Sequence, residues 1–551
     1  MVFAVSAFQR WVAQEWVCLK GNWEAGCAAP ILPFLFNFVQ VSRGLFRQIL
    51  SIPRASSPFN MSTPKKQWIL NAFVMQSPGH LNPGLFKYPR DKGRKYNDIK
   101  HWISLAQKLE AAKFHAIFFA DVLGGYDVYK GPANLEPTIS AASQFPINDP
   151  LYSVPAMAAA TENIGFGITA STTYELPYAL ARKFSTVDHL SNGRVAWNIV
   201  TSYLDSAARN FGLNTQIEHD ERYRIAHEYL DVVYKLWEGS WRDDAVSNAP
   251  QGAYADPNAV RQINHKGKYF QVPGPHICEP SRQRTPFLFQ AGTSTAGRKF
   301  AATHAEAIFL NGHTAELVRP SVDSIRAQAK ELGRNSHSVK IVAGVLVIVA
   351  ETDEKAQAKF EELARYGDRE GALALFGGWS GYDLSKYGDD EDFRFLDSAP
   401  PAVRSMVNHW ASTSPQGWKW NKKTIAEHLI IGGNGAKIIG SPTTVADELE
   451  RWIEVADVDG FNLSYASIPE TFDDLIEHLL PELRRRGLVW SDYAVPGGTL
   501  RENYFGEQGQ NRLSDSHPGA KYFWKAGEEV PEYMKDASDP KSKDTIIGQA
   551  S

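Results

Sequence analysis

The chain has 551 residues, 43% hydrophobic and 22% charged, so it can bury at least one large core and is not disordered by composition. Its 58 basic and 62 acidic residues give a formal net charge of -4, which argues against nucleic acid as a partner. Cys18, Cys27 and Cys278 are too few for a disulfide framework and lack zinc-ribbon spacing, which favours a reduced, cytoplasmic location.

The beginning of the chain differs in composition from the rest. Residues 1–60 contain five basic and two acidic residues, a balance typical of mitochondrial presequences, although Met61 also resembles a natural start. We expect residues 1–65 to be an N-terminal extension that is disordered, a targeting peptide or a non-native upstream start. A presequence would imply a mitochondrial location. The apolar tract at 28–41 is shorter than the roughly 20 residues of a membrane helix, so no membrane span is expected.

From residue 68 onward, apolar runs typical of strands alternate with stretches of helical periodicity. Apolar residues recur at three- and four-residue steps over 99–112 and 225–236, which predicts two crossover helices. Apolar strands that are each followed by a helix predict an α/β fold with a parallel sheet, and eight can close as a (β/α)8 TIM barrel; an open doubly wound sheet is the alternative. The predicted strands are 68–75, 116–120, 164–170, 194–200, 286–290, 307–310, 341–350 and 460–464.

The predicted barrel, residues 66–515, is much longer than the roughly 250 residues of a plain barrel, so large insertions are expected. Residues 240–282 are rich in Asp, Asn, Pro and Gly, and 367–430 contain a glycine-rich stretch and then an acidic run. Loops of this length are usually lids or binding elements. Residues 516–551 are predicted to form a C-terminal tail.

Two short motifs resemble sites of other enzyme classes. Gly165-Phe-Gly-Ile-Thr-Ala170 matches a dinucleotide-binding pattern, but its glycines lie within a predicted strand. Gly292-Thr293-Ser294 lies at a strand-to-helix junction, so a serine hydrolase using Ser294 is an alternative. Small residues and hydroxyls before a helix at 296–305 favour a phosphate site instead. The His, Asp and Glu spacings predict no metal site.

Polar residues follow several predicted strands. Asp121 ends the second strand, a hydroxyl-rich stretch at 171–175 ends the third, and Thr201 and Ser202 end the fourth. Because the catalytic groups of a barrel gather at the carboxyl ends of its strands, these side chains indicate an active site.

Six ordered motifs carry a resemblance to a known family. Residues 119–122, 170–175, 186–202, 219–223, 289–294 and 439–443 resemble signature blocks of the flavin-dependent monooxygenases of the bacterial-luciferase-like superfamily. The resembling branch contains the nitrilotriacetate, dibenzothiophene-sulfone and pristinamycin-type monooxygenase A components. The resemblance implies a barrel that binds reduced FMN from a separate flavin reductase and uses O₂ to oxygenate an organic substrate. It also implies a homo-oligomer, either a dimer or a tetramer.

The same resemblance implies residue roles. Flavin-binding positions are Asp121, Thr172, His219, Tyr223 and Ser294, with Asn198 and Thr293 as neighbours. The substrate side is expected to contain Phe73, Phe114, Phe376 and Trp379, and His80 is the candidate for proton transfer because a histidine pKa lies near 6.5. Aromatic walls favour an apolar aromatic or organosulfur xenobiotic over a polycarboxylate. An F420-dependent oxidoreductase of this fold and a non-catalytic flavin-binding barrel are further alternatives.

Overall fold

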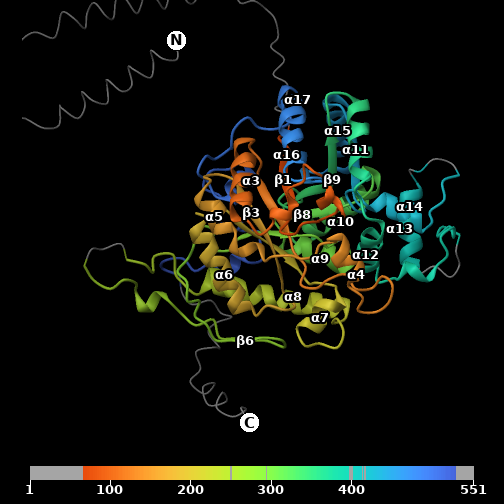
Figure 1. Ribbon diagram of the computed structural model, residues 1–551. Helices are drawn as coiled ribbons and strands as arrows, with labels where there is room; N and C mark the ends of the chain where they lie inside the picture. Colours follow the sequence, from red (N-terminus) through yellow and green to blue (C-terminus); the bar gives the residue numbers. More distant parts are fainter. Residues whose placement is uncertain are drawn as a thin grey trace, which may run out of the picture. The chain divides into compact units, whose positions relative to one another are not determined.

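Eight parallel strands close into a barrel, which confirms the predicted fold class over an open sheet (Figure 1). The order around the ring is β11-β1-β2-β3-β4-β7-β8-β9, and pairing of β8 with β9 closes it. All eight predicted strands are confirmed to within one residue at each end. Their bounds are β1 (Ile69–Met75), β2 (Ala116–Ala120), β3 (Gly165–Ser171), β4 (Val195–Val200), β7 (Phe287–Gln290), β8 (Ala307–Asn311), β9 (Lys340–Val349) and β11 (Gly460–Ser464).

This computed structural model describes residues 66–247, 251–292, 294–395, 401–412, 414 and 417–528. The described residues belong to one compact unit that begins at Lys65. The expectations for residues 1–65, for Thr293 and for the end of the C-terminal tail lie outside the described residues.

A ninth parallel strand, β10 (Ala436–Gly440), was not predicted from the sequence. The first half of β9 pairs with β8 as far as Gly344 opposite Asn311, and the second half pairs with β10 from Val345 onward. Thus β9 extends beyond the barrel and carries β10 above its rim. The short antiparallel hairpin of β5 (His265–Lys266) and β6 (Gln271–Val272) lies in the predicted 240–282 insertion.

Helices surround the barrel, and the two helices predicted from periodicity are α3 (Ile99–Ala111) and α8 (His219–Tyr234). Trp102, Leu105 and Leu109 of α3 are buried against the strands, as the apolar spacing predicts. No helix within the described ranges is both long and apolar enough to cross a membrane. The other helices are α4 (Glu136–Ala141), α5 (Val154–Ala159), α6 (Pro177–Leu190), α7 (Asp205–Asn210), α9 (Thr295–His304), α10 (Ala315–Glu331), α11 (Asp353–Ala364), α12 (Arg369–Ser380), α13 (Pro401–Ala411), α14 (Lys422–Leu429), α15 (Pro442–Ala456), α16 (Glu470–Asp474), α17 (Leu480–Arg485) and α18 (Leu500–Phe505).

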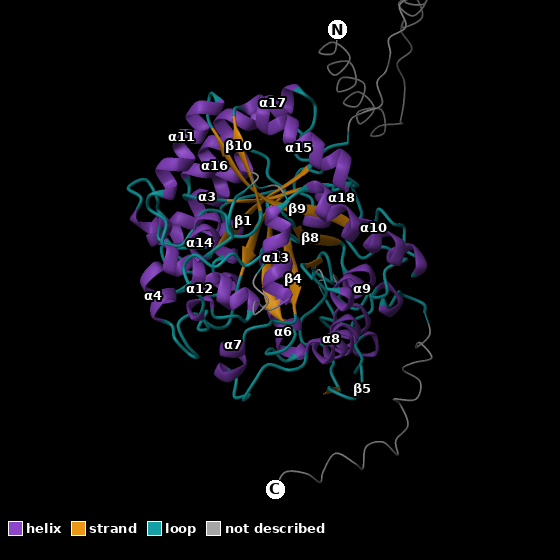
Figure 2. Cartoon of the chain, turned by 90° about the vertical axis from the view of Figure 1, so that its right-hand side faces the viewer, coloured by secondary structure: helices purple, strands orange, loops and turns teal. Residues whose placement is uncertain are grey.

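The 367–430 insertion contains three helices, in contrast to the loop that its glycines suggested. It forms α12, α13 and α14, which lie together on one side of the barrel in Figure 1; Figure 2, seen from that side, shows α13 in front of the strands. The glycines of α12 serve close packing, because a Cβ at Gly378 would overlap the ring of Tyr126.

The glycines of the dinucleotide-like motif face the barrel interior from β3. A Cβ at Gly167 would lie 3.2 Å from Phe289 and 3.3 Å from Phe118, whose rings fill the interior at this level. These glycines therefore make room for aromatic packing and do not form a nucleotide-binding turn.

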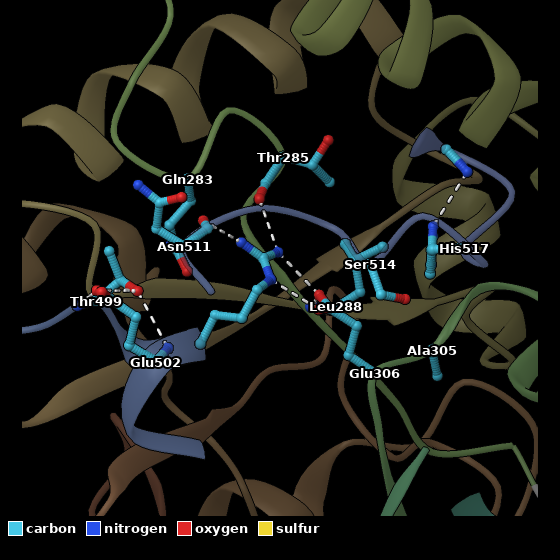
Figure 3. A network of polar contacts seen from close by, with 12 residues as sticks. Gln283, Thr285, Leu288, Ala305, Glu306, Thr499, Glu502, Asn511, Ser514 and His517 are labelled. Atoms are coloured by element: carbon cyan, nitrogen blue, oxygen red, sulfur yellow. Dashed lines mark hydrogen bonds and ion pairs between the residues drawn. The ribbon is translucent and has the colours of Figure 1, made fainter. Parts of the chain in front are cut away.

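The amino-terminal end of the barrel is closed by the C-terminal segment around α18. Arg501 is fully buried and binds the carboxylate of Glu306 through Nε and Nη2 at 2.7 and 2.9 Å. Its guanidinium also donates to the carbonyls of Thr285 at 2.9 Å and Asn511 at 2.8 Å, and these partners converge in Figure 3. The pair joins α18 to the strand ends around it.

The folded part continues beyond the predicted boundary at residue 515. His517, Tyr522 and Trp524 are buried, and the His517 ring lies 2.8 Å from the carbonyl oxygen of His304. The predicted start of the C-terminal tail at residue 516 is therefore too early. Residues 516–528 pack against the barrel because their aromatic side chains cover apolar surface.

Replacing Arg501 by Met should lower the free energy of unfolding by roughly 3–5 kcal/mol, because it leaves the Glu306 carboxylate buried without its partner. The control is Arg319→Ala, which breaks an exposed pair with Asp323 and should cost at most about 1 kcal/mol. Urea unfolding of both variants measures the difference. Equal losses of stability in the two would show that the buried pair does not hold this end of the barrel.

Candidate active site

A cavity of about 370 Å³ opens where the carboxyl ends of β1, β2, β8 and β11 meet β9 and β10. We call it the tyrosine cavity. Phe73 lines it from β1, His80 from the loop after β1, and Trp379 from α12, so three predicted substrate-side residues are brought together here. The further wall residues used below are Tyr126, Gln144, Tyr203, Asn311 and Asn434.

Three residues that the sequence motifs did not single out form a polar row in this cavity. The Tyr126 hydroxyl donates to Gln144 Oε1 at 2.9 Å and lies 3.0 Å from the Tyr203 hydroxyl. Tyr203 follows Thr201 and Ser202 at the end of β4, so the strand-end signal could have included it. Tyr126 and Gln144 lie in loops and carry no comparable sequence signal.

His80 is buried beside aromatic rings. Its imidazole lies edge-on to Phe73, with ring centres 4.6 Å apart, and 5.8 Å from the ring of Tyr465. Burial lowers the pKa of His80 to about 3, so the ring is neutral near pH 7. Its Nδ1 has no hydrogen-bond partner among the described residues. A neutral imidazole with an unpaired nitrogen can accept a hydrogen bond from a group in the cavity, and as a relay it would take up a proton at Nδ1 only while releasing the one on Nε2.

The wall of the tyrosine cavity contains no Asp, Glu, Lys or Arg among the described residues. With His80 neutral, the wall carries no formal charge near pH 7. A buried charge on a ligand would find no partner of opposite sign there, so the cavity favours a neutral molecule.

Asp121 borders a smaller neighbouring cavity of about 120 Å³, which shares Val122 and Tyr203 with the tyrosine cavity. Burial, together with the negative charges of Asp149 and Glu175, raises the pKa of Asp121 to about 8. Glu175 is paired with Lys183 at 2.7 Å. Asp121 is therefore mostly protonated near pH 7 and can donate a hydrogen bond as well as accept one.

A third group of predicted residues lies where α8 meets the start of α9. A Cβ at Gly292 or Gly297 would lie 2.7 or 2.8 Å from the Tyr223 hydroxyl oxygen, so only glycine permits this approach. His219 is exposed one turn earlier, and its ring centre is 5.2 Å from that of Tyr223. Backbone amides at a helix start, a tyrosine hydroxyl and a histidine suit a phosphate group.

Ser294 is the N-cap of α9, and its Oγ accepts from the backbone N–H of Gly297 at 3.0 Å. Within the described residues, this hydroxyl contacts its own helix and not a histidine, which disfavours the serine hydrolase alternative. Among the described residues, no cluster of three or more His, Cys, Asp or Glu side chains could hold a metal ion.

Two buried amides lie on the neighbouring strands β4 and β7, Asn198 opposite Phe289 in the register and Gln290 opposite Ile199. Asn198 Oδ1 and Gln290 Oε1 have no hydrogen-bond partner among the described residues, although both side chains are only 4% exposed. Buried amides are normally satisfied, so each unpaired oxygen is available to a hydrogen-bond donor of a ligand that reaches it. Thr172 instead ties β3 to β4, donating through its backbone N–H to the Val200 carbonyl at 3.0 Å.

Two predicted substrate residues lie away from the cavities. Phe114 precedes β2 at the amino-terminal end of the barrel and packs on Phe472, because it belongs to the α3–β2 turn. Phe376 is a fully buried residue of α12 that packs in the core of the insertion, with its ring centre 6.1 Å from that of Trp410. Aromatic composition alone could not distinguish core from cavity positions.

Comparison with known proteins agrees with this arrangement. The family described as luciferase-like monooxygenase matches residues 76–458. The dimethyl-sulfide monooxygenase of Hyphomicrobium sulfonivorans is 46% identical over 83% of this chain and 94% of that protein. This chain belongs to the luciferase-like monooxygenase family.

Solved structures support the same family placement. The crystal structure of DmoA from Hyphomicrobium sulfonivorans matches with a TM-score of 0.78 and 45% identity over 83% of this chain and 96% of that one. A riboflavin lyase solved with modified FMN and riboflavin matches with a TM-score of 0.75 and 34% identity over 83% and 100%. The long-chain alkane monooxygenase of Geobacillus thermodenitrificans is 46% identical over 82% of this chain and 97% of that protein. The predicted family is thus confirmed, and its relatives include the dibenzothiophene-sulfone and nitrilotriacetate monooxygenases named from the motifs.

Asp121→Asn should stabilise this luciferase-like monooxygenase increasingly as pH rises from 5 to 8. The pKa of Asp121 is about 8 in the folded chain and about 3.9 when unfolded. The buried, protonated carboxyl therefore contributes its full stability below pH 4, and the free energy of unfolding falls as pH rises from 4 toward 8 because the unfolded chain can ionise this group. Asn stays neutral and avoids that loss. Thermal midpoints of the flavin-free variant, the parent and the exposed control Asp515→Asn at pH 5, 6.5 and 8 measure the effect. A pH-independent difference would mean that Asp121 titrates normally.

Proposed function

We propose that the chain is a monooxygenase that uses reduced FMN and O₂ to oxygenate a neutral organic substrate. The observation that supports this most directly is the uncharged tyrosine cavity at the barrel rim, adjoining the cavity of Asp121. A site built for hydrolysis or for a charged substrate would need fixed charges that this wall lacks.

The described residues fit FMN as the cofactor. Tyr223 and His219, together with the start of α9, would hold the phosphate, and Asn198 and Gln290 offer unpaired amide oxygens to hydrogen-bond donors. Asp121 could donate to or accept from the flavin ring or ribityl chain. When bound, reduced FMN supplies the electrons that activate O₂. The related riboflavin lyase structure with modified FMN supports the same choice.

The protein's own groups have three tasks in this reaction. Phe73, Trp379 and the neighbouring apolar wall exclude water from the reacting substrate. The Tyr126–Tyr203 pair and Gln144 can orient a substrate that carries a hydrogen-bonding atom, whereas a hydrocarbon would be held by the apolar wall alone. His80 is positioned to move one proton, because its neutral ring lines the cavity and has an unpaired Nδ1.

We propose a neutral, weakly polar substrate, such as an organosulfur compound or a hydrocarbon. Two relatives at 46% identity are a dimethyl-sulfide and a long-chain alkane monooxygenase, and both substrate classes are uncharged. A polycarboxylate would need basic side chains, and the described cavity wall has none. We further propose a cytoplasmic homo-oligomer that receives reduced FMN from a separate reductase, as the name of a component A relative suggests.

The direct test mixes the protein with photoreduced FMN and air, with and without dimethyl sulfide or a liquid alkane. The expected result is substrate-dependent formation of an oxygenated product, with less hydrogen peroxide released than in the absence of protein. Peroxide release identical to that of free reduced FMN, with no product from either substrate, would contradict the proposal.

Ser294→Asp should weaken binding of reduced FMN by at least tenfold, or about 1.4 kcal/mol, because it places a carboxylate beside a phosphate dianion. Asp caps helices as well as Ser does, so α9 should remain intact. Ser294→Thr keeps the hydroxyl cap without the charge and is the matched control. Equilibrium titration with reduced FMN under anaerobic conditions measures both. Unchanged affinity in the Asp variant would place the phosphate elsewhere.

A further inference from the structure

The smaller cavity beside Asp121, which we call the Asp121 cavity, differs from the tyrosine cavity in its ionisable groups. The tyrosine cavity is lined by one histidine and two tyrosines as its only ionisable side chains among the described residues. The Asp121 cavity shares Tyr203 with it and is otherwise lined by three carboxyl groups and one amine, those of Asp121, Asp149, Glu175 and Lys183. Acid and base chemistry is therefore concentrated on one side of the site.

The proposed reaction needs a source of protons. Reduced FMN gives two electrons, one atom of O₂ is added to the substrate, and the other atom leaves as water. When the reduced ring binds as its anion, it brings one of the two hydrogens of that water. The second must arrive as a proton from the protein, which balances the charge as the flavin becomes neutral and oxidised.

The ionisable groups of the tyrosine cavity are poor sources of this proton. Because burial lowers the pKa of His80 to about 3, its ring carries no second proton near pH 7. Burial raises the pKa of Tyr126 and of Tyr203, so both hydroxyls hold their protons more tightly than a tyrosine in water. His80 can relay a proton, but the proton must come from another group.

Asp121 lies where the two cavities meet. Its chain neighbours Ala120 and Val122 both line the tyrosine cavity, whereas its own side chain lines the Asp121 cavity. Burial and the charges of Asp149 and Glu175 raise its pKa to about 8, so the carboxyl carries a proton near pH 7. An acid whose pKa lies close to the working pH is an effective proton donor.

The Asp121 cavity also reaches solvent. Asp149 in its wall is exposed, and the Lys183 side chain, paired with Glu175 at 2.7 Å, is 39% exposed. The hydroxyls of Ser171 and Ser202 line the same cavity 2.8 Å apart. Since hydroxyls and carboxylates can each accept hydrogen bonds, and hydroxyls can also donate, these groups can return a proton from solvent to Asp121.

We propose that Asp121 is the proton donor of the oxygenation, with Asp149 and Glu175 as positioning residues that act on it through their charges. In each turnover the O–H bond of the Asp121 carboxyl breaks and its proton goes to the oxygen atom that leaves as water. The carboxylate then takes up a proton from solvent through the Asp121 cavity. This inference rests on the proposed function for the reaction, whereas the protonation of Asp121 can be measured without flavin.

The first test is infrared difference spectroscopy of the full-length, flavin-free protein between pH 6 and pH 9.5, with Asp121→Asn as the reference. The parent should show the C=O band of a protonated carboxyl, lost with a midpoint near pH 8. Asp149→Asn keeps the cap on the Leu151 N–H but removes the charge, so the midpoint should fall by about half a pH unit or more. Glu175→Gln should lower it in the same direction.

The control is Asp515→Asn, which removes an exposed charge outside both cavities and should leave the midpoint where it is. Absence of the carboxyl band in the parent at pH 7 would overturn the inference. A midpoint that is the same in the parent, Asp149→Asn and Glu175→Gln would also overturn it.

The second test follows product formation with photoreduced FMN over the same pH range. In the parent it should fall above about pH 8, and in Asp149→Asn the fall should begin at lower pH. Asp121→Asn can still form hydrogen bonds but has no acidic proton, so product formation should drop at least about a hundredfold while affinity for reduced FMN stays within a factor of about three.

Unchanged product formation in Asp121→Asn would contradict the assignment. A loss of reduced-FMN affinity as large as the loss of product would also contradict it, because Asp121 would then act only in binding the cofactor. Failure of the proposed function would appear separately, as no product from the parent protein at any pH, and the infrared titration would still decide whether Asp121 holds a proton.

Discussion

Closure of the parallel ladder by the β8–β9 pairing is the constraint on which the rest of the molecule depends. Because all eight strands run in the same direction, closure brings Met75, Asp121, Ser202 and Asn311 to one rim although they are far apart in the sequence. At the opposite end the buried pair of Arg501 and Glu306 holds the closing segment in place. The amino-terminal end of the barrel is thus closed, and the cavities lie at the carboxyl-terminal end.

Burial sets the electrical character of that rim. Desolvation disfavours the charged form of any group, so it lowers the pKa of His80 to about 3 and raises that of Asp121 to about 8. Both groups are then uncharged over much of the neutral range. A wall of aromatic rings, hydroxyls and amides remains, which can orient a neutral substrate by hydrogen bonds and exclude water without attracting ions.

The insertion between β9 and β10 contributes part of the wall of the tyrosine cavity. β9 extends past the barrel and pairs with β10, so the chain between these two strands lies over the rim. From it come Trp379 on α12 and Gly432, Asn434 and Gly435 of the loop before β10, which line the tyrosine cavity. The barrel therefore fixes the position of the tyrosine cavity, and the insertion contributes to the size and shape of that cavity.

The sequence by itself determined the eight strands, the family and the polar strand ends, because continuous apolar runs and strand-end motifs are local signals. It did not determine β10 or the helical nature of 367–430, where glycines needed for packing against Tyr126 resembled a loop. Nor could it separate Trp379 from Phe376, or place Phe114 at the far end of the barrel, since aromatic residues serve core and cavity alike. The Tyr126–Gln144–Tyr203 row and the two connected cavities arise only from tertiary structure, because their residues come from separate loops that the closed barrel brings together.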